Sequence, residues 1–219
     1  QRVAGKSLPV ISLFRQSLDW SPDGKMLAIL FSTGVQIWDW QLLGDPDGNG
    51  GPFEVLPIGF AIDWGPLDDL KKEGDLFDSK IAIGSNNGTI NIVQIGFERN
   101  PANNKIIKVN KHVELVDAHD RNINGRVVTV LWSPDGRRLA SGTNSFFRQR
   151  QVNAPNEIKI WDTGDFSREI QVILIKPRQI KLGGQKLRLG TNVFSLAWRA
   201  DKRFIAAGLD DGTVRVFNK

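Results

Sequence analysis

The chain has 219 residues, 40% of them hydrophobic and 24% charged, which is the composition of a folded globular chain. It contains no cysteine, which excludes disulfide scaffolds, thiolate metal sites and cysteine nucleophiles. Its net charge of +5 mildly favours anionic partners. The longest apolar run, residues 26–31, is far shorter than the about 20 residues that span a membrane, so we expect no membrane insertion. We expect the chain to be intracellular, either cytoplasmic or nuclear.

Short alternating runs that end in tryptophan recur along the chain. Trp20, Trp64, Trp132 and Trp198 end the runs 17–20, 61–64, 127–132 and 193–198, at intervals of 44, 68 and 66 residues. Ser-Pro-Asp-Gly follows the first and third of these tryptophans. A divergent form of this turn, Arg-Ala-Asp-Lys, follows the fourth. Proline and glycine suit the fixed and the positive φ angles of a tight turn, so each run is predicted to be a strand with an antiparallel neighbour.

Each repeat continues with further strand patterns. The predicted second strands are residues 26–30, 80–84, 138–142 and 204–208, and the predicted third strands are residues 35–39, 89–95, 158–162 and 213–218. Weaker fourth strands are predicted at residues 53–58, 113–117 and 169–175. The interval of 44 residues is close to the roughly 40–45 of a propeller blade, and the two longer intervals indicate loop insertions.

These repeats resemble those of the WD40-repeat family of β-propellers. Trp38-Asp39 and Trp161-Asp162 end third strands where the family places its Trp-Asp pair, and Ala118-His119 precedes a first strand where the family often has Gly-His. The resemblance implies an all-β, WD40-like β-propeller of about four blades, each with four antiparallel strands. It also implies a single domain over residues 1–219, with blade cores at about 15–58, 59–117, 126–175 and 192–219.

The family also builds a buried hydrogen-bond set in each blade from His, Ser or Thr, Trp and a turn Asp. The third repeat has His119, Ser141 and Trp161, but Pro155-Asn156 occupies the turn. Apolar residues replace the set in other repeats, which is physically sensible because a half-satisfied polar network costs stability. The resemblance assigns structural roles to eight residues: Trp20, Trp38, Trp64, His119, Trp132, Ser141, Trp161 and Trp198.

The number of blades bears on whether the ring is complete. The last repeat reaches only its third strand, and residues 7–13 are a candidate for its fourth strand, as in the family's usual ring closure. Four blades are few for the family, and an open arc would leave exposed sheet edges. We therefore expect part of a larger propeller, completed by further blades or by a partner, with a small closed ring as the alternative.

Two insertions carry the candidate binding residues. By order along the chain, both are predicted to emerge as loops on the same face of the propeller and to form a basic, aromatic-bearing patch. Its members are Phe146, Phe147, Arg148, Arg150, Lys176, Arg178, Lys181, Lys186 and Arg188. Such a patch suits an acidic or phosphorylated segment or a nucleic-acid backbone. A pair of solvated loops explains the same residues, and arginine with phenylalanine is also common in protein interfaces.

No pattern predicts catalysis, a cofactor or a metal. Residues 45–50 match the opening of a calcium loop, but Leu56 stands at the twelfth position, where a bidentate acid belongs. His119-Asp120 has no nucleophile motif to accompany it. The acidic residues of 65–79 fit a solvated loop.

The leading hypothesis is a non-catalytic protein-interaction scaffold that docks with other protein subunits in a multiprotein assembly. The alternative is a propeller of a ribonucleoprotein or chromatin-linked complex that binds RNA or DNA through the basic patch. A second alternative is the sensor tail of a multidomain signalling ATPase. The fold by itself does not choose among these functions.

Overall fold

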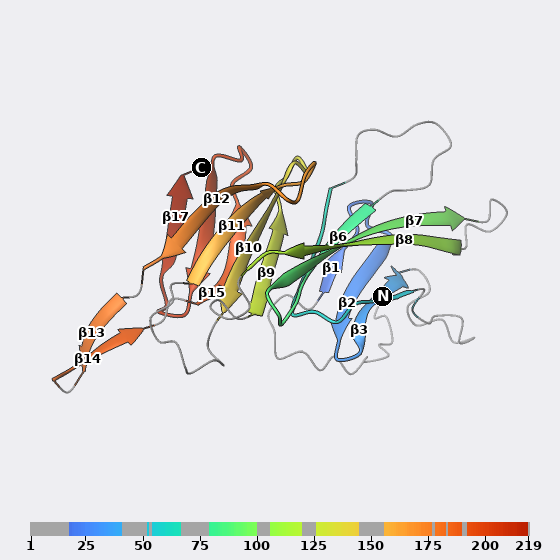
Figure 1. Cartoon of the computed structure of the whole chain (residues 1–219). Helices are drawn as coiled ribbons and strands as arrows, with labels where there is room; N and C mark the ends of the chain where they lie inside the picture. The colour runs from blue at the N-terminus through green and yellow to red at the C-terminus, as the bar shows by residue number, and fades with distance from the viewer. Residues whose placement is uncertain are drawn as a thin grey trace, which may run out of the picture.

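The structure is a computed structural model that describes residues 18–40, 52, 54–66, 79–99, 106–119, 126–144, 156–176, 178–182, 184–189 and 192–218. Strands β1 to β17 account for most of these residues (Figure 1). The described part of the chain contains no helix long and apolar enough to cross a membrane.

Four antiparallel sheets follow one another along the chain and stack side by side (Figure 1). Blade 1 consists of β1 (Leu18–Trp20), β2 (Met26–Phe31), β3 (Gly34–Asp39) and β4 (Glu54–Leu56). Blade 2 consists of β5 (Ala61–Trp64), β6 (Ser79–Gly84), β7 (Thr89–Arg99) and β8 (Ile106–Asp117). Blade 3 consists of β9 (Arg126–Trp132), β10 (Arg138–Asn144), β11 (Asn156–Asp162) and β12 (Glu169–Ile175). Blade 4 consists of β15 (Val193–Trp198), β16 (Phe204–Leu209) and β17 (Val214–Asn218).

The turn between the first and second strands repeats its geometry from blade to blade. Gly24 in blade 1 and Gly136 in blade 3 have φ angles of 69° and 68°, the left-handed region that glycine enters without steric cost. In blade 1, Ser21 Oγ donates a hydrogen bond to Asp23 Oδ1 at 2.6 Å, which closes the turn. Lys202 takes the same conformation in blade 4, with φ of 63°. The divergent turn of blade 4 therefore keeps the backbone conformation of the other turns, at some cost in backbone strain.

The hydrophobic core lies between the blades. Neighbouring blades bury their facing sides against each other, so three apolar layers hold the four sheets together. The central layer includes Ala82 and Ile92 of blade 2 and Val130, Leu139 and Trp161 of blade 3. Strand alternation supplies both faces because successive side chains point to opposite sides of a sheet.

The prediction of an all-β chain built from four-stranded antiparallel blades is confirmed for blades 1 to 3. Blade 4 has three strands within the described part of the chain, and residues 7–13 lie outside it. The insertion at residues 183–190 was predicted to be a loop with basic flanks. Residues 178–189 instead form a hairpin of β13 (Arg178–Leu182) and β14 (Gln185–Leu189), which lies apart from the blades (Figure 1). These residues form strands because basic and apolar residues alternate along them, a pattern that suits a two-stranded ribbon.

Candidate functional site

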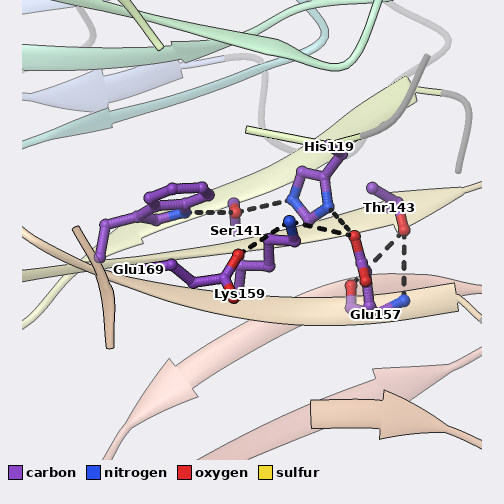
Figure 2. Close-up of polar contacts among 7 residues, drawn as sticks. His119, Ser141, Thr143, Glu157, Lys159 and Glu169 are labelled. Carbon is purple, nitrogen blue, oxygen red and sulfur yellow. Dashed lines mark hydrogen bonds and ion pairs between the residues drawn. The ribbon is translucent and has the colours of Figure 1, made fainter. Parts of the chain in front are cut away.

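A buried polar network joins blade 3 to the turn that precedes it (Figure 2). His119 Nε2 lies 2.8 Å from Ser141 Oγ, and Trp161 Nε1 donates to the same hydroxyl oxygen at 3.1 Å. The other ring nitrogen of His119, Nδ1, lies 2.8 Å from Glu157 Oε1. Burial lowers the pKa of His119, so the ring is neutral at pH 7. Nδ1 then donates to the carboxylate, and the Ser141 hydroxyl donates to Nε2.

Glu157 is the member of this network that the sequence did not reveal. The resemblance places the acid in a turn, whereas Glu157 is the second residue of β11 and reaches His119 from the strand. Lys159 Nζ bridges Glu157 Oε1 at 3.7 Å and Glu169 Oε2 at 2.8 Å, which partly neutralises the acid. All hydrogen-bonding groups of the imidazole are thereby satisfied. The network ties the segment before β9 to β10 and β11 of the same blade.

Two aspartates connect the innermost strands of neighbouring blades. Asp19 Oδ2 of blade 1 accepts a hydrogen bond from the Trp64 backbone N–H of blade 2 at 2.6 Å. Asp63 Oδ2 of blade 2 accepts one from the Trp132 backbone N–H of blade 3 at the same distance. Burial raises the pKa of Asp63 to about 8, and the nearby Asp19 carboxylate adds to the rise. The sequence signal for this seam was the Asp-Trp pair that ends β1 and β5.

The tryptophans predicted to be structural differ in their surroundings. Trp64 and Trp132 are each only 6% exposed, and Trp132 Nε1 donates to the Asp63 carbonyl of the preceding blade at 3.1 Å. Trp198 Nε1 likewise donates to the Leu131 carbonyl at 3.3 Å. Trp20, in the first blade, is 45% exposed. It has the same place in its repeat, but the described chain offers no preceding blade to cover it.

The basic patch is described only in part. Phe146, Phe147, Arg148 and Arg150 lie outside the described residues, and Lys176 is exposed just after β12. The hairpin pairs Arg178 with Leu189, Gln179 with Arg188 and Lys181 with Lys186. Lys181, Lys186 and Arg188 therefore occupy neighbouring positions of one face of the ribbon, and Arg178 belongs to the other face. How near this hairpin comes to residues 146–150 stays a prediction.

An exposed apolar stripe runs along the outer strand of blade 3. Ile170, Val172 and Leu174 are 41%, 39% and 56% exposed and recur at every second position of β12, so they share one face of the strand. β12 is the outermost strand of its sheet, and no described strand pairs with its free edge. We call these three residues the β12 stripe. Large aliphatic side chains gathered at a sheet edge are typical of interaction surfaces.

The stacked antiparallel blades define a β-propeller fold. The family model described as "WD domain, G-beta repeat" (WD40) matches residues 111–151 and 184–218. These two segments are WD40 repeats, and the resemblance to the WD40 family is confirmed there. No curated protein matches the chain. Among solved structures, one titled "Crystal Structure of Mitotic Checkpoint Complex" contains a chain with a TM-score of 0.53 and 17% sequence identity, covering 93% of this chain and 46% of that one. This chain thus spans less than half the length of that neighbour.

Proposed function

We propose that the chain is a non-catalytic scaffold that docks other protein subunits within a multiprotein assembly. The observation that carries the proposal is the β12 stripe, displayed on blades that buried seams hold rigid. A rigid display surface loses little conformational entropy when a partner binds, so more of the contact energy appears as affinity. WD40 repeats and the likeness to a chain of a multiprotein complex support the same class of function.

The proposed partner surface is apolar and extended, because the β12 stripe lies beside a free strand edge to which a partner segment can pair. Replacing Val172 and Leu174 with glutamate should abolish the co-purification of protein partners with the chain, measured as the amount of partner recovered. The melting temperature should stay unchanged. Ile58→Glu is the matched control, since Ile58 is 59% exposed and lies between β4 and β5, outside β12. Equal partner recovery by the double variant and the control would refute docking at β12.

A second candidate function is binding of an anionic segment or nucleic acid by the hairpin. Its support is the register of the hairpin, which pairs Lys181 with Lys186 and Gln179 with Arg188 and so places three basic residues at neighbouring positions of the ribbon. Lys181→Glu with Arg188→Glu should abolish binding of a labelled single-stranded RNA, and the wild-type affinity should fall steeply with salt. Arg168→Glu with Arg203→Glu is the matched charge control, because both arginines are exposed and lie outside the hairpin. Loss of affinity in the control as well would refute a role for the hairpin.

A further inference from the structure

The turn that joins β6 to β7 in blade 2 has the sequence Asn86-Asn87-Gly88 (Figure 1). Asn87 is exposed, and Gly88 has a φ angle of 84°, in the left-handed region that favours glycine. When glycine follows asparagine, no Cβ obstructs the approach of the glycine nitrogen to the side-chain amide. The turn therefore places an exposed amide beside a backbone nitrogen that can attack it.

The amide oxygen of Asn87 is held by two donors from one residue. Thr89 Oγ1 donates to Asn87 Oδ1 at 2.6 Å, and the Thr89 backbone N–H donates to the same oxygen at 3.3 Å. Donors that point at a carbonyl oxygen stabilise the negative charge that this oxygen gains when its carbon is attacked. Thr89 is only 1% exposed, so its donors are fixed in place and little screened by water. Thr89 is thus placed to assist attack on the Asn87 amide.

The backbone N–H of Gly88 differs from its counterpart in blade 4. There the Gly212 N–H donates back across the turn to the Leu209 carbonyl at 3.2 Å. In blade 2 the corresponding carbonyl, that of Ser85, instead accepts a hydrogen bond from the Val127 N–H of blade 3 at 2.9 Å. The Gly88 N–H therefore has no hydrogen-bond partner among the described residues, and no such bond holds its nitrogen away from the side chain of Asn87.

Blade 4 already has an aspartate at the equivalent position of the turn. The Thr213 hydroxyl and N–H both donate to Asp211 Oδ1, the same arrangement that Thr89 makes with Asn87. The hydrogen bond from the Thr213 side chain holds the pKa of Asp211 below its usual value. This turn therefore accepts an ionised carboxylate at the place where blade 2 has an amide.

We propose that Asn87 is a site of spontaneous deamidation, assisted by Thr89. The Gly88 nitrogen gives its proton to water and forms a bond to Cγ of Asn87. The bond from Cγ to Nδ2 then breaks, and the amide nitrogen takes up a proton from water and leaves as ammonia. A second water molecule opens the resulting succinimide ring at one of its two carbonyl carbons. The product is either an ordinary aspartate or a β-aspartyl linkage, in which the main chain runs through the former side chain.

The two products have different consequences for blade 2. An aspartate adds a negative charge to an exposed turn and keeps the two hydrogen bonds from Thr89. A β-aspartyl linkage lengthens the main chain beside Gly88, whose carbonyl accepts a hydrogen bond from the His119 N–H at 2.8 Å. It also lies within the turn that the bond from the Ser85 N–H to the Thr89 carbonyl closes at 2.9 Å. The β-aspartyl product should therefore loosen the contact between blade 2 and the segment that carries His119.

Peptide mapping by mass spectrometry of the purified chain, incubated at mildly alkaline pH, tests the proposal. The peptide that contains Asn87 should gain the mass of an amide-to-acid exchange, with the β-aspartyl form separated by chromatography. Thr89→Val should slow this conversion about 2–10-fold, because it removes one hydrogen bond of ordinary strength, and Thr89→Ser should restore the rate. Thr213→Val is the matched control, since it removes the same hydroxyl from the turn of blade 4, and it should convert Asn87 at the wild-type rate.

The same maps contain their own references. Asn49-Gly50 and Asn124-Gly125 are the other Asn-Gly pairs of the chain, and substitution of Thr89 should leave their conversion unchanged. An unconverted Asn87 in a sample where the other two pairs convert, or equal rates in the wild type and Thr89→Val, would overturn the proposal. If Thr89→Val fails to fold, Thr89→Ala takes its place and should slow the conversion in the same way. Asn87→Asp should melt no lower than wild type at neutral pH, and a clearly lower melting temperature would contradict the accommodation inferred from blade 4.

Discussion

Replacement of Trp132 with alanine measures how much one seam between blades contributes to stability. The side chain is 6% exposed and packs against the backbone at Gly65, where an added Cβ would lie 3.2 Å from the indole. Its ring meets Phe166 edge-on with centroids 6.2 Å apart, and its Nε1 donates to the Asp63 carbonyl. Truncation of a buried aromatic residue costs about 3–5 kcal/mol, and the rigid strands on both sides leave little scope for the cavity to collapse. We expect a loss of about 4–5 kcal/mol, in the upper part of that range.

Trp20→Ala is the internal comparison, because Trp20 holds the same position in blade 1 but is 45% exposed. With about half of the side chain already in water, its truncation should cost only about 1–2 kcal/mol. For a chain of this size, about 2–4 °C of melting temperature corresponds to 1 kcal/mol, so the Trp132 variant should melt about 8–20 °C lower than wild type. Calorimetry measures both changes. Equal losses for the two tryptophans would refute the reasoning that a preceding blade is what buries this position.

Three further substitutions have expected outcomes. The pKa of Asp63 is raised to about 8, above the pKa of an aspartate in the unfolded chain, so the folded chain should lose stability as pH rises from about 4 to 8. Asp63→Asn should reduce this dependence of the melting temperature on pH and should stabilise the chain at pH 7. Glu157→Ala should cost about 1–3 kcal/mol in urea unfolding because it leaves the buried Nδ1 of His119 unpaired, and Glu157→Gln, which keeps an acceptor, should cost less. Lys202→Gly should raise the melting temperature by relieving a left-handed backbone, whereas Lys202→Ala should lower it by losing only the ion pair with Asp135.

Regular strands were predictable because their signals are local. The Trp-ended runs, the turn glycines and the alternation of apolar residues lie within each repeat, and β5, β12 and β15 begin and end at the residues predicted from the sequence. The pairing of His119 with Ser141 and Trp161 followed from the family resemblance, which fixes which strands bring these residues together. Each of these inferences needed only the order of residues within one repeat.

The features that were missed depend on contacts between segments. Glu157 directly follows the Pro155-Asn156 turn in which an acid was expected, and only the path of β11 shows that it reaches His119. The β13–β14 hairpin was read as a loop because its basic residues and glycines outweighed the alternation of Ile180, Leu182, Leu187 and Leu189. The exposure of Trp20 has no local signal at all, since tryptophans in the same motif are buried or partly buried where a blade precedes them.

The apolar layers between the blades also explain why polar sets could be lost from individual blades without loss of the fold. Blade 2 places Ile83 and Val93 where blade 3 has Ser141 and Trp161, and both apolar residues are fully buried. An apolar replacement keeps the layer packed and leaves no hydrogen-bonding group unsatisfied, whereas a partial polar set would do so. Blade 1 keeps Trp38 but has Ile29 at the position of Ser141, and there the indole N–H is buried without a partner among the described residues. Blade 1 therefore departs from the complete apolar replacement that blade 2 shows.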